Sequence, residues 1–370
     1  MIRAYAVFSN KTSSYEFWFS DEEDEIEDLH FETVRVERRR LRDLSNSLDM
    51  PSNLFLNYFR VSKELFRYLL NIVDGKLGGT KSSSVQPMLK LSAALRFFAE
   101  GSYQKGVGND FFAGMAQPTL SKALSAVIDV FEALICPAAI KFPVSEVEKR
   151  EIKHSFYEKT GFPGVIGCVD GTHVRIVKPV GDIQHLYYNR KGFHSLNVML
   201  VCDHKQMIRY VDANSPGANH DSFIWNNNPL DVELSQQYQN GERNTWLLGD
   251  AGYPLKPYLI TPFRSSGDAR QTKFNEIHSK TRMLIERTIG VMKNVFRCIL
   301  GARQLHYKPE KAAKIVNVCC ALHNLRKQFN LPDDNFDELI DIHQIEDNAH
   351  DDENDASANE IRQQIMYSIA

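Results

Sequence analysis

Acidic residues interrupt two apolar runs that otherwise predict buried strands, and this combination restricts how the chain can fold. Asp170 lies in GVIGCVDGTHVRI and Asp250 in TWLLGDAGYPL, while Glu286 lies in an amphipathic helix predicted over 275–299. A buried carboxylate must be paired or bind a metal, because removing its charge from water is costly. We therefore expect these acids to converge at one sheet edge and to form an oxygen-rich site for a divalent cation such as Mg²⁺. Such a site suits phosphoryl transfer.

Each of these acids also has an ordinary structural interpretation. Asp170 precedes a glycine and Asp250 precedes Ala-Gly, so both could be turn residues. Glu286 could simply pair with Arg282, which lies four residues earlier on the same predicted helix. The residues alone leave both interpretations open.

The apolar runs around these acids predict an open α/β domain. Short runs rich in Val, Ile and Leu predict strands, and longer amphipathic runs predict helices. The predicted strands cover 164–178, 195–206, 207–217 and 244–252, and the predicted helices cover 220–234, 275–299 and 305–329. In such a domain, ligands bind at the carboxyl ends of the strands.

The region before this domain predicts helices in a helix-turn-helix outline. Pro87 can open a helix that Gly101 stops, a short helix fits 104–112, and Pro118 begins a third helix. In a helix-turn-helix the start of the last helix faces the DNA groove. The candidate groove-facing residues are Gln117, Thr119, Ser121 and Lys122. An ordinary helical bundle without DNA contacts fits the pattern equally well.

Charge is distributed unevenly along the chain, although the net charge is only −3. Residues 21–28 contain seven acids, and residues 331–370 contain twelve acids and a single arginine, so residues 29–330 carry a net +14. A basic body favours a polyanion such as nucleic acid, although the same charges also serve solubility. Six cysteines without a CxxC pair predict reduced thiols in the cytosol or nucleus, and no apolar stretch predicts a membrane span.

These patterns divide the chain into four predicted segments. An irregular acidic N-terminus (1–30) precedes a helical, candidate DNA-binding domain (31–145), which is followed by the α/β domain (146–330). The acidic tail (331–370) is predicted to be disordered or loosely attached, although ANEIRQQIMYSI near its end retains a helical pattern.

Further basic residues of the α/β domain are candidates for DNA phosphate contacts. Two of them lie in a predicted loop, NRKG, and four lie along the helix that carries Glu286. They are Arg190, Lys191, Lys280, Arg282, Arg287 and Lys293. A solvated loop and a solvated helix face are the alternatives.

Several sequence blocks together resemble the PIF/Harbinger transposases and the nucleases derived from them. The blocks are DGTHVRI, YNRKGFHSLNVMLVCD, PGANHDS, LLGDAGYPLKPYLITPF, ERTIGVMK and LHYKPEKAAKIVNVCCALHN. They are spread over most of residues 60–330, and as a set they are specific.

The resemblance implies a ribonuclease H-like catalytic domain that cleaves DNA phosphodiester bonds, with strand transfer as a further reaction. It implies a metal-binding catalytic triad of Asp170, Asp250 and Glu286, loaded with Mg²⁺ or Mn²⁺, and Asp221 in PGANHDS is a weaker candidate ligand. It also implies an N-terminal helix-turn-helix region, double-stranded DNA as the substrate, a Myb-like companion protein, oligomers on DNA, and a nuclear location with the cytoplasm as a second compartment. A catalytically silent DNA-binding protein or adaptor is the alternative function.

Overall fold

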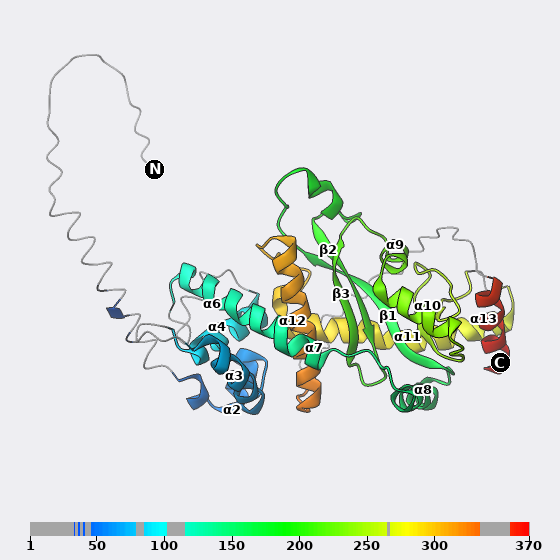
Figure 1. Cartoon of the computed structure of the whole chain (residues 1–370), viewed down its shortest axis with the longest axis horizontal. Helices are drawn as coiled ribbons and strands as arrows, with labels where there is room; N and C mark the ends of the chain where they lie inside the picture. The colour runs from blue at the N-terminus through cyan, green and yellow to red at the C-terminus, as the bar shows by residue number, and fades with distance from the viewer. Residues whose placement is uncertain are drawn as a thin grey trace, which may run out of the picture.

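The structure, a computed structural model, describes most of the chain. The described residues are 46–78, 85–101, 115–264, 267–333 and 356–369, with isolated helical residues at 33, 36, 37 and 40. Figure 1 shows a helical region at one end, a sheet with its flanking helices in the centre, and a C-terminal helix at the far end. None of the helices in these ranges is both long enough and apolar enough to cross a membrane.

A five-stranded mixed sheet forms the centre of the molecule, in the order β3-β2-β1-β4-β5. The strands are β1 (Val165–Arg175), β2 (Ser195–Cys202), β3 (Ile208–Pro216), β4 (Trp246–Leu248) and β5 (Leu259–Ile260). β1, β2 and β3 form an antiparallel meander, whereas β4 is parallel to both β1 and β5. The first four strands lie on the predicted apolar runs. β5 was not predicted, because two residues are too few to show a strand pattern.

Two layers of helices cover the two faces of the sheet. The helices are α9 (Asp221–Asn226), α10 (Pro229–Gln239), α11 (Ala269–Val295) and α12 (Pro309–Gln328). Successive strand residues point to opposite faces. Cys168 and Leu200 therefore share a core with α11 and α12, whereas Val169 and Val201 share a smaller core with α9 and α10. The predicted mixed α/β architecture is confirmed.

The helix predicted over 220–234 is divided into α9 and α10. The Asn228 side chain accepts a hydrogen bond from the Leu230 backbone N–H (3.0 Å), and Pro229 follows as the first residue of α10. This is a helix start, since Asn is a preferred N-cap and Pro fits the first helical turn. The division leaves α9 as a separate short helix that begins at Asp221.

The helical region before the sheet has most of the predicted boundaries. Its elements are η1 (Ser47–Asp49), α2 (Ser52–Phe59), α3 (Lys63–Leu77), α4 (Pro87–Glu100), α6 (Gln117–Val130), a π-helical turn (Phe131–Ile135), α7 (Cys136–Ala139) and α8 (Glu146–Thr160). The Ser62 hydroxyl caps α3 by accepting from Leu65 N–H (3.2 Å), as its sequence predicts. The predicted short helix at 104–112 lies outside the described residues, so the helix-turn-helix stays a prediction.

Buried contacts join the helical region to the rest of the molecule. α4 ends at Gly101, whose φ of 63° suits glycine, and a Cβ there would lie 2.6 Å from the Arg297 carbonyl oxygen. Core residues of α2, α4 and α6 form one cluster with those of α11, α12 and one face of the sheet. The boundary at residue 145 stays a prediction, since packing continues across it.

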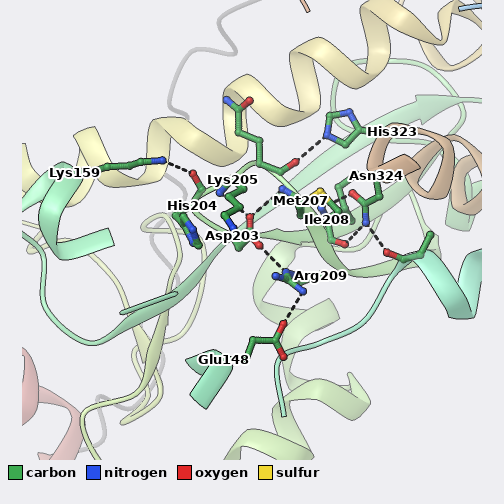
Figure 2. A network of polar contacts seen from close by, with 12 residues as sticks. Glu148, Lys159, Asp203, His204, Lys205, Met207, Ile208, Arg209, His323 and Asn324 are labelled. Atoms are coloured by element: carbon green, nitrogen blue, oxygen red, sulfur yellow. Dashed lines mark hydrogen bonds and ion pairs between the residues drawn. The ribbon is translucent and has the colours of Figure 1, made fainter. Parts of the chain in front are cut away.

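A polar network fixes the β2–β3 turn and ties it to α12 and α8 (Figure 2). Asp203 accepts from the backbone N–H groups of Lys205 and Met207, and its second oxygen pairs with Arg209 (2.7 Å). Arg209 also reaches Glu148 of α8 (2.9 Å).

From α12, the Asn324 side chain bonds both backbone groups of Ile208 and the Ala139 carbonyl (Figure 2). One buried amide therefore links the sheet, α12 and the end of the helical region.

Part of the acidic tail is ordered and packed, which corrects the prediction of a disordered 331–370 segment. Residues Ala356–Ser368 form α13, and Ile365 and Met366 are buried in the main core. Arg362 donates to the Pro262 carbonyl (3.1 Å) and lies over the Phe263 ring. The helical pattern near the end of the chain was the correct signal. Residues 334–355 lie outside the described residues.

Candidate active site

Asp170 and Asp250 lie on neighbouring parallel segments at the same level of the sheet. The β1–β4 register pairs Cys168 with Leu248, and each aspartate follows two residues later. β4 ends at Leu248, so Asp250 belongs to a turn in which its carboxylate accepts from Gly252 N–H (2.9 Å). The strand beside β1 stops at this point, which leaves Asp170 at an opening at the carboxyl end of β4.

Asp221 approaches the same region from the α9 side of the sheet. It is the first residue of α9 and accepts from the Asn197 side chain of β2 (3.0 Å). A Cβ on Gly171 would lie 2.5 Å from Asp221 Oδ1, so a side chain on β1 at this position would displace the carboxylate. The glycine after Asp170 therefore has a specific role: it makes room for a third acid.

Arg282 bridges the two acids on the α11 side. Its guanidinium lies 3.5 Å from Asp170 Oδ2 and forms a close ion pair with Glu286, one turn further along α11. The Arg282 side chain is only 9% exposed, compared with 18% for Asp170 and 39% for Glu286. The structure thus brings Glu286 to the site through an arginine that contacts both acids.

Burial and mutual repulsion disfavour the charged forms of two of these acids. Burial raises the pKa of Asp170 to about 8, and the charges of Asp250, Asp221 and Glu286 add to the rise, although Arg282 opposes it. Burial and Asp250 raise the pKa of Asp221 to about 6. Burial alone would lower the pKa of Arg282, but Asp170, Glu286 and Asp250 raise it overall. One arginine therefore compensates these acids only in part.

The chemistry of the donor set fits a hard divalent cation, but the distances between its side chains do not. Carboxylate oxygens are the ligands that Mg²⁺ and Mn²⁺ prefer, and a shortage of positive charge favours an added cation. Within the described ranges, however, no three His, Cys, Asp or Glu side chains converge closely enough to hold a metal ion. Arg282 lies between Asp170 and Glu286, so Glu286 can join a shared ion only when the guanidinium moves.

Two basic residues predicted to line a phosphate channel point inward, which corrects that prediction. Arg282 faces the acids, as described above. Lys293 is buried and donates to the Thr172 hydroxyl (2.7 Å) and to the His173 carbonyl (2.9 Å) of β1. These cations stabilise the strand and the acids rather than an outer surface. Lys280 and Arg287 are exposed on α11.

The remaining DNA-binding candidates lie on the surface in two separate places. Arg190 and Lys191 are exposed in the β1–β2 connection, and Arg190 contacts the His220 ring (2.8 Å), next to Asp221. At the start of α6, Gln117 and Lys122 are exposed, whereas Thr119 and Ser121 are half-buried. Arg190 is therefore close to Asp221, and the second group belongs to the helical region.

Sequence reasoning missed two features of the site. It treated Arg282 only as a helix partner or a phosphate contact, because its spacing from Glu286 carried no information about β1. It assigned no role to Tyr253, which lies in the GDAGYP block and is buried. The apolar neighbours of Tyr253 in the sequence, Pro254 and Leu255, gave no signal of a polar environment.

Comparison with known proteins agrees with this arrangement. Residues 169–324 match the model of the DDE superfamily endonuclease family. The human protein "Putative nuclease HARBI1" is 31% identical over 328 residues, which cover 86% of this chain and 91% of the relative. The Arabidopsis thaliana "Protein ALP1-like" is 25% identical over 291 residues, 73% of this chain and 70% of the relative. No solved structure matches.

The matched segment begins one residue before Asp170 and includes Asp221, Asp250 and Glu286. The similarity to the human relative extends well beyond this segment, over most of the chain. The chain belongs to the Harbinger transposase-derived nucleases of the DDE endonuclease superfamily.

Proposed function

We propose that the protein is a metal-dependent DNA endonuclease with a ribonuclease H-like catalytic domain. The observation that carries the proposal is that acids from four separate segments approach one partly compensated site. Asp170 comes from β1, Asp221 from α9, Asp250 from the turn after β4 and Glu286 from α11. A fold has no structural need to bury this much like charge, so a cation is the natural complement.

The residues that would hold the ion are Asp170, Asp250 and Asp221, with Glu286 joining after Arg282 moves. A bound divalent cation supplies stabilisation for negative charge on the phosphate and on the departing oxygen. Arg282 keeps the carboxylates of Asp170 and Glu286 in place. The turn at Gly252 fixes the Asp250 carboxylate, and Asn197 orients that of Asp221.

Double-stranded DNA is the proposed substrate. The net charge of +14 over residues 29–330 supports binding to a polyanion. Arg190 and Lys191 are exposed beside the acids, where they would hold phosphates on either side of the cleaved bond. The start of α6, with exposed Gln117 and Lys122, is the proposed second DNA contact.

A nuclear location, a Myb-like companion protein and oligomers on DNA complete the proposal. They follow from the family resemblance and from the basic body of the chain. A catalytically silent DNA-binding protein is less consistent with the site, because all four acids are present and Asp170 feels the charges of the other three.

Cleavage of supercoiled plasmid DNA with Mg²⁺ or Mn²⁺ tests the proposal. Asp170→Asn should abolish nicking and linearisation, because the substitution removes the carboxylate between Arg282 and Asp250. Asp74→Asn, an exposed residue on α3, should cleave as the wild type does. Cleavage by Asp170→Asn at the wild-type rate would rule out the proposed site.

A further inference from the structure

The Tyr253 hydroxyl is a buried polar group without a hydrogen-bond partner. Tyr253 follows Asp250 by three residues, and its N–H closes the turn on the Asp250 carbonyl (3.2 Å). The side chain is 4% exposed, and its ring packs edge-on against Trp225 of α9 (6.0 Å between centroids). Among the described residues, no atom accepts from or donates to its hydroxyl oxygen.

Three other polar groups in or beside the same apolar cluster have hydrogen-bond partners. The Tyr258 hydroxyl donates to Asp231 (2.9 Å), and the Trp225 ring N–H donates to the same carboxylate (2.7 Å). Tyr210, at the edge of this cluster, donates to Asn228 (2.7 Å). Buried hydroxyls normally have partners, because a lost hydrogen bond to water is otherwise uncompensated. The exception at Tyr253 therefore requires a local reason.

The charges of the acids of the candidate site act on this hydroxyl. Burial raises the pKa of Tyr253 well above its ordinary value, and the charges of Asp221, Asp170 and Asp250 contribute in that order. The phenol thus remains a protonated donor at every physiological pH. Asp221 and Asp250 belong to the segments that hold the ring, α9 and the turn after β4.

We propose that Tyr253 is a positioning residue whose hydroxyl donates a hydrogen bond to the Asp221 carboxylate when a divalent cation draws the acids together. The inference rests on the proposed cation site. Asn197 already holds one oxygen of Asp221 (3.0 Å), and Tyr253 supplies the donor for the other. With a hydrogen bond to each of its oxygens, the Asp221 carboxylate loses less conformational freedom when it binds the cation. Partners of this kind typically change metal affinity 10- to 100-fold.

Two measurements test this role. One is calorimetric titration of the full-length protein with MnCl₂, and the other is thermal unfolding of the protein without added cations. Tyr253→Phe should weaken Mn²⁺ binding by about ten-fold. It should leave the cation-free Tm unchanged or raise it, because the deleted hydroxyl has no bond to lose. Tyr258→Phe is the matched control: it should lower the Tm, because it breaks the bond to Asp231, and should leave Mn²⁺ affinity unchanged.

The outcomes separate this role from the existence of the site. If the wild type binds Mn²⁺, Asp170→Asn does not, and Tyr253→Phe binds as tightly as the wild type, the role of Tyr253 is wrong and the site stands. A fall in both Tm and affinity for Tyr253→Phe would indicate a packing role and also overturn the inference. If the wild type binds no Mn²⁺, or Asp170→Asn binds it normally, the proposed site and the role of Tyr253 both fail.

Discussion

Arg282 is the residue on which the charge balance of the site depends. It contacts Asp170 and Glu286 with one guanidinium and is nearly buried, so solvent does little to screen these interactions. Asp221 and Asp250 receive no comparable cation contact among the described residues. The arginine thus supplies part of the positive charge that a divalent cation would provide, at the place where Glu286 would meet that cation.

Replacing this arginine should make the protein depend on added cations for stability. Arg282→Gln leaves Asp170 and Glu286 without their shared partner. This should lower the free energy of unfolding by about 1 kcal/mol, because Glu286 is partly exposed and Asp170 can take up a proton. MnCl₂ should raise the Tm of Arg282→Gln more than that of the wild type, because the ion replaces the missing charge. Thermal unfolding with and without MnCl₂ measures both effects.

The control for this substitution is Arg287→Gln, an exposed position on the same helix, which should behave as the wild type. Equal losses of unfolding free energy in Arg282→Gln and Arg287→Gln would contradict this explanation of the charge balance. An equal rise in Tm with MnCl₂ in the wild type and both variants would contradict it as well.

α12 is the element that connects the sheet to the helical region. Asn324 bonds Ile208 of β3 and Ala139 of α7, and His323 donates from Nε2 to the Gln206 carbonyl in the β2–β3 turn (2.9 Å, Figure 2). Burial lowers the pKa of His323 to about 4, although the bond to Gln206 opposes the shift. The packing of α12 therefore requires a neutral imidazole.

This requirement predicts a loss of stability in mild acid. The folded pKa of about 4 lies below the ordinary value of 6.5, so the stabilisation is present above pH 6.5 and falls as the pH approaches 4. Between pH 7 and pH 5 the loss from His323 should be about 2 kcal/mol. Urea unfolding at the two pH values measures it, and His323→Gln should show a smaller difference. The same pH dependence in the wild type and in His323→Gln would contradict this assignment.

The sequence predicted elements well where a long apolar pattern was present. The core face of α11, with Ile285, Ile289 and Met292, was read correctly from helical periodicity, and these residues are buried. The same periodicity did not reveal that Arg282 and Lys293 turn inward, because the pairing of a cation depends on groups that β1 supplies. β5 and the packing of α13 likewise depend on neighbours that are distant in the sequence.

For the same reason, only part of the candidate site was predicted from the sequence. Asp170, Asp250 and Glu286 were recognisable as acids in or beside apolar segments and from the family resemblance. The approach of Asp221 through Gly171 and the buried hydroxyl of Tyr253 are consequences of the β1–β4 pairing and of the short helix α9. Such contacts cannot be derived from the periodicity of a single segment.

The whole molecule combines a basic body with a strongly acidic connection between α12 and α13. Residues 334–355 contain ten acids and no lysine or arginine. The helices that flank this segment, α12 and α13, both pack into the main core. We expect the negative charge of this segment to compete with DNA for the basic side chains of the body.

Neutralising this segment should therefore strengthen DNA binding. Replacing its ten acids with Asn and Gln keeps the chain length and leaves α13 intact. The Kd for double-stranded DNA should fall several-fold at low salt, and the difference should shrink as salt screens the charges. Fluorescence anisotropy over a salt series measures this effect. Equal affinities of the two proteins at low salt would show that the acidic segment does not compete with DNA.

Anomalous scattering from crystals grown with MnCl₂ would locate a bound cation among these acids. We expect a manganese peak bonded to carboxylate oxygens of Asp170 and Asp250, with Arg282 moved away from Glu286. The contradictory result is a crystal with saturating Mn²⁺ that has no peak among these acids and in which Arg282 still bridges Asp170 and Glu286.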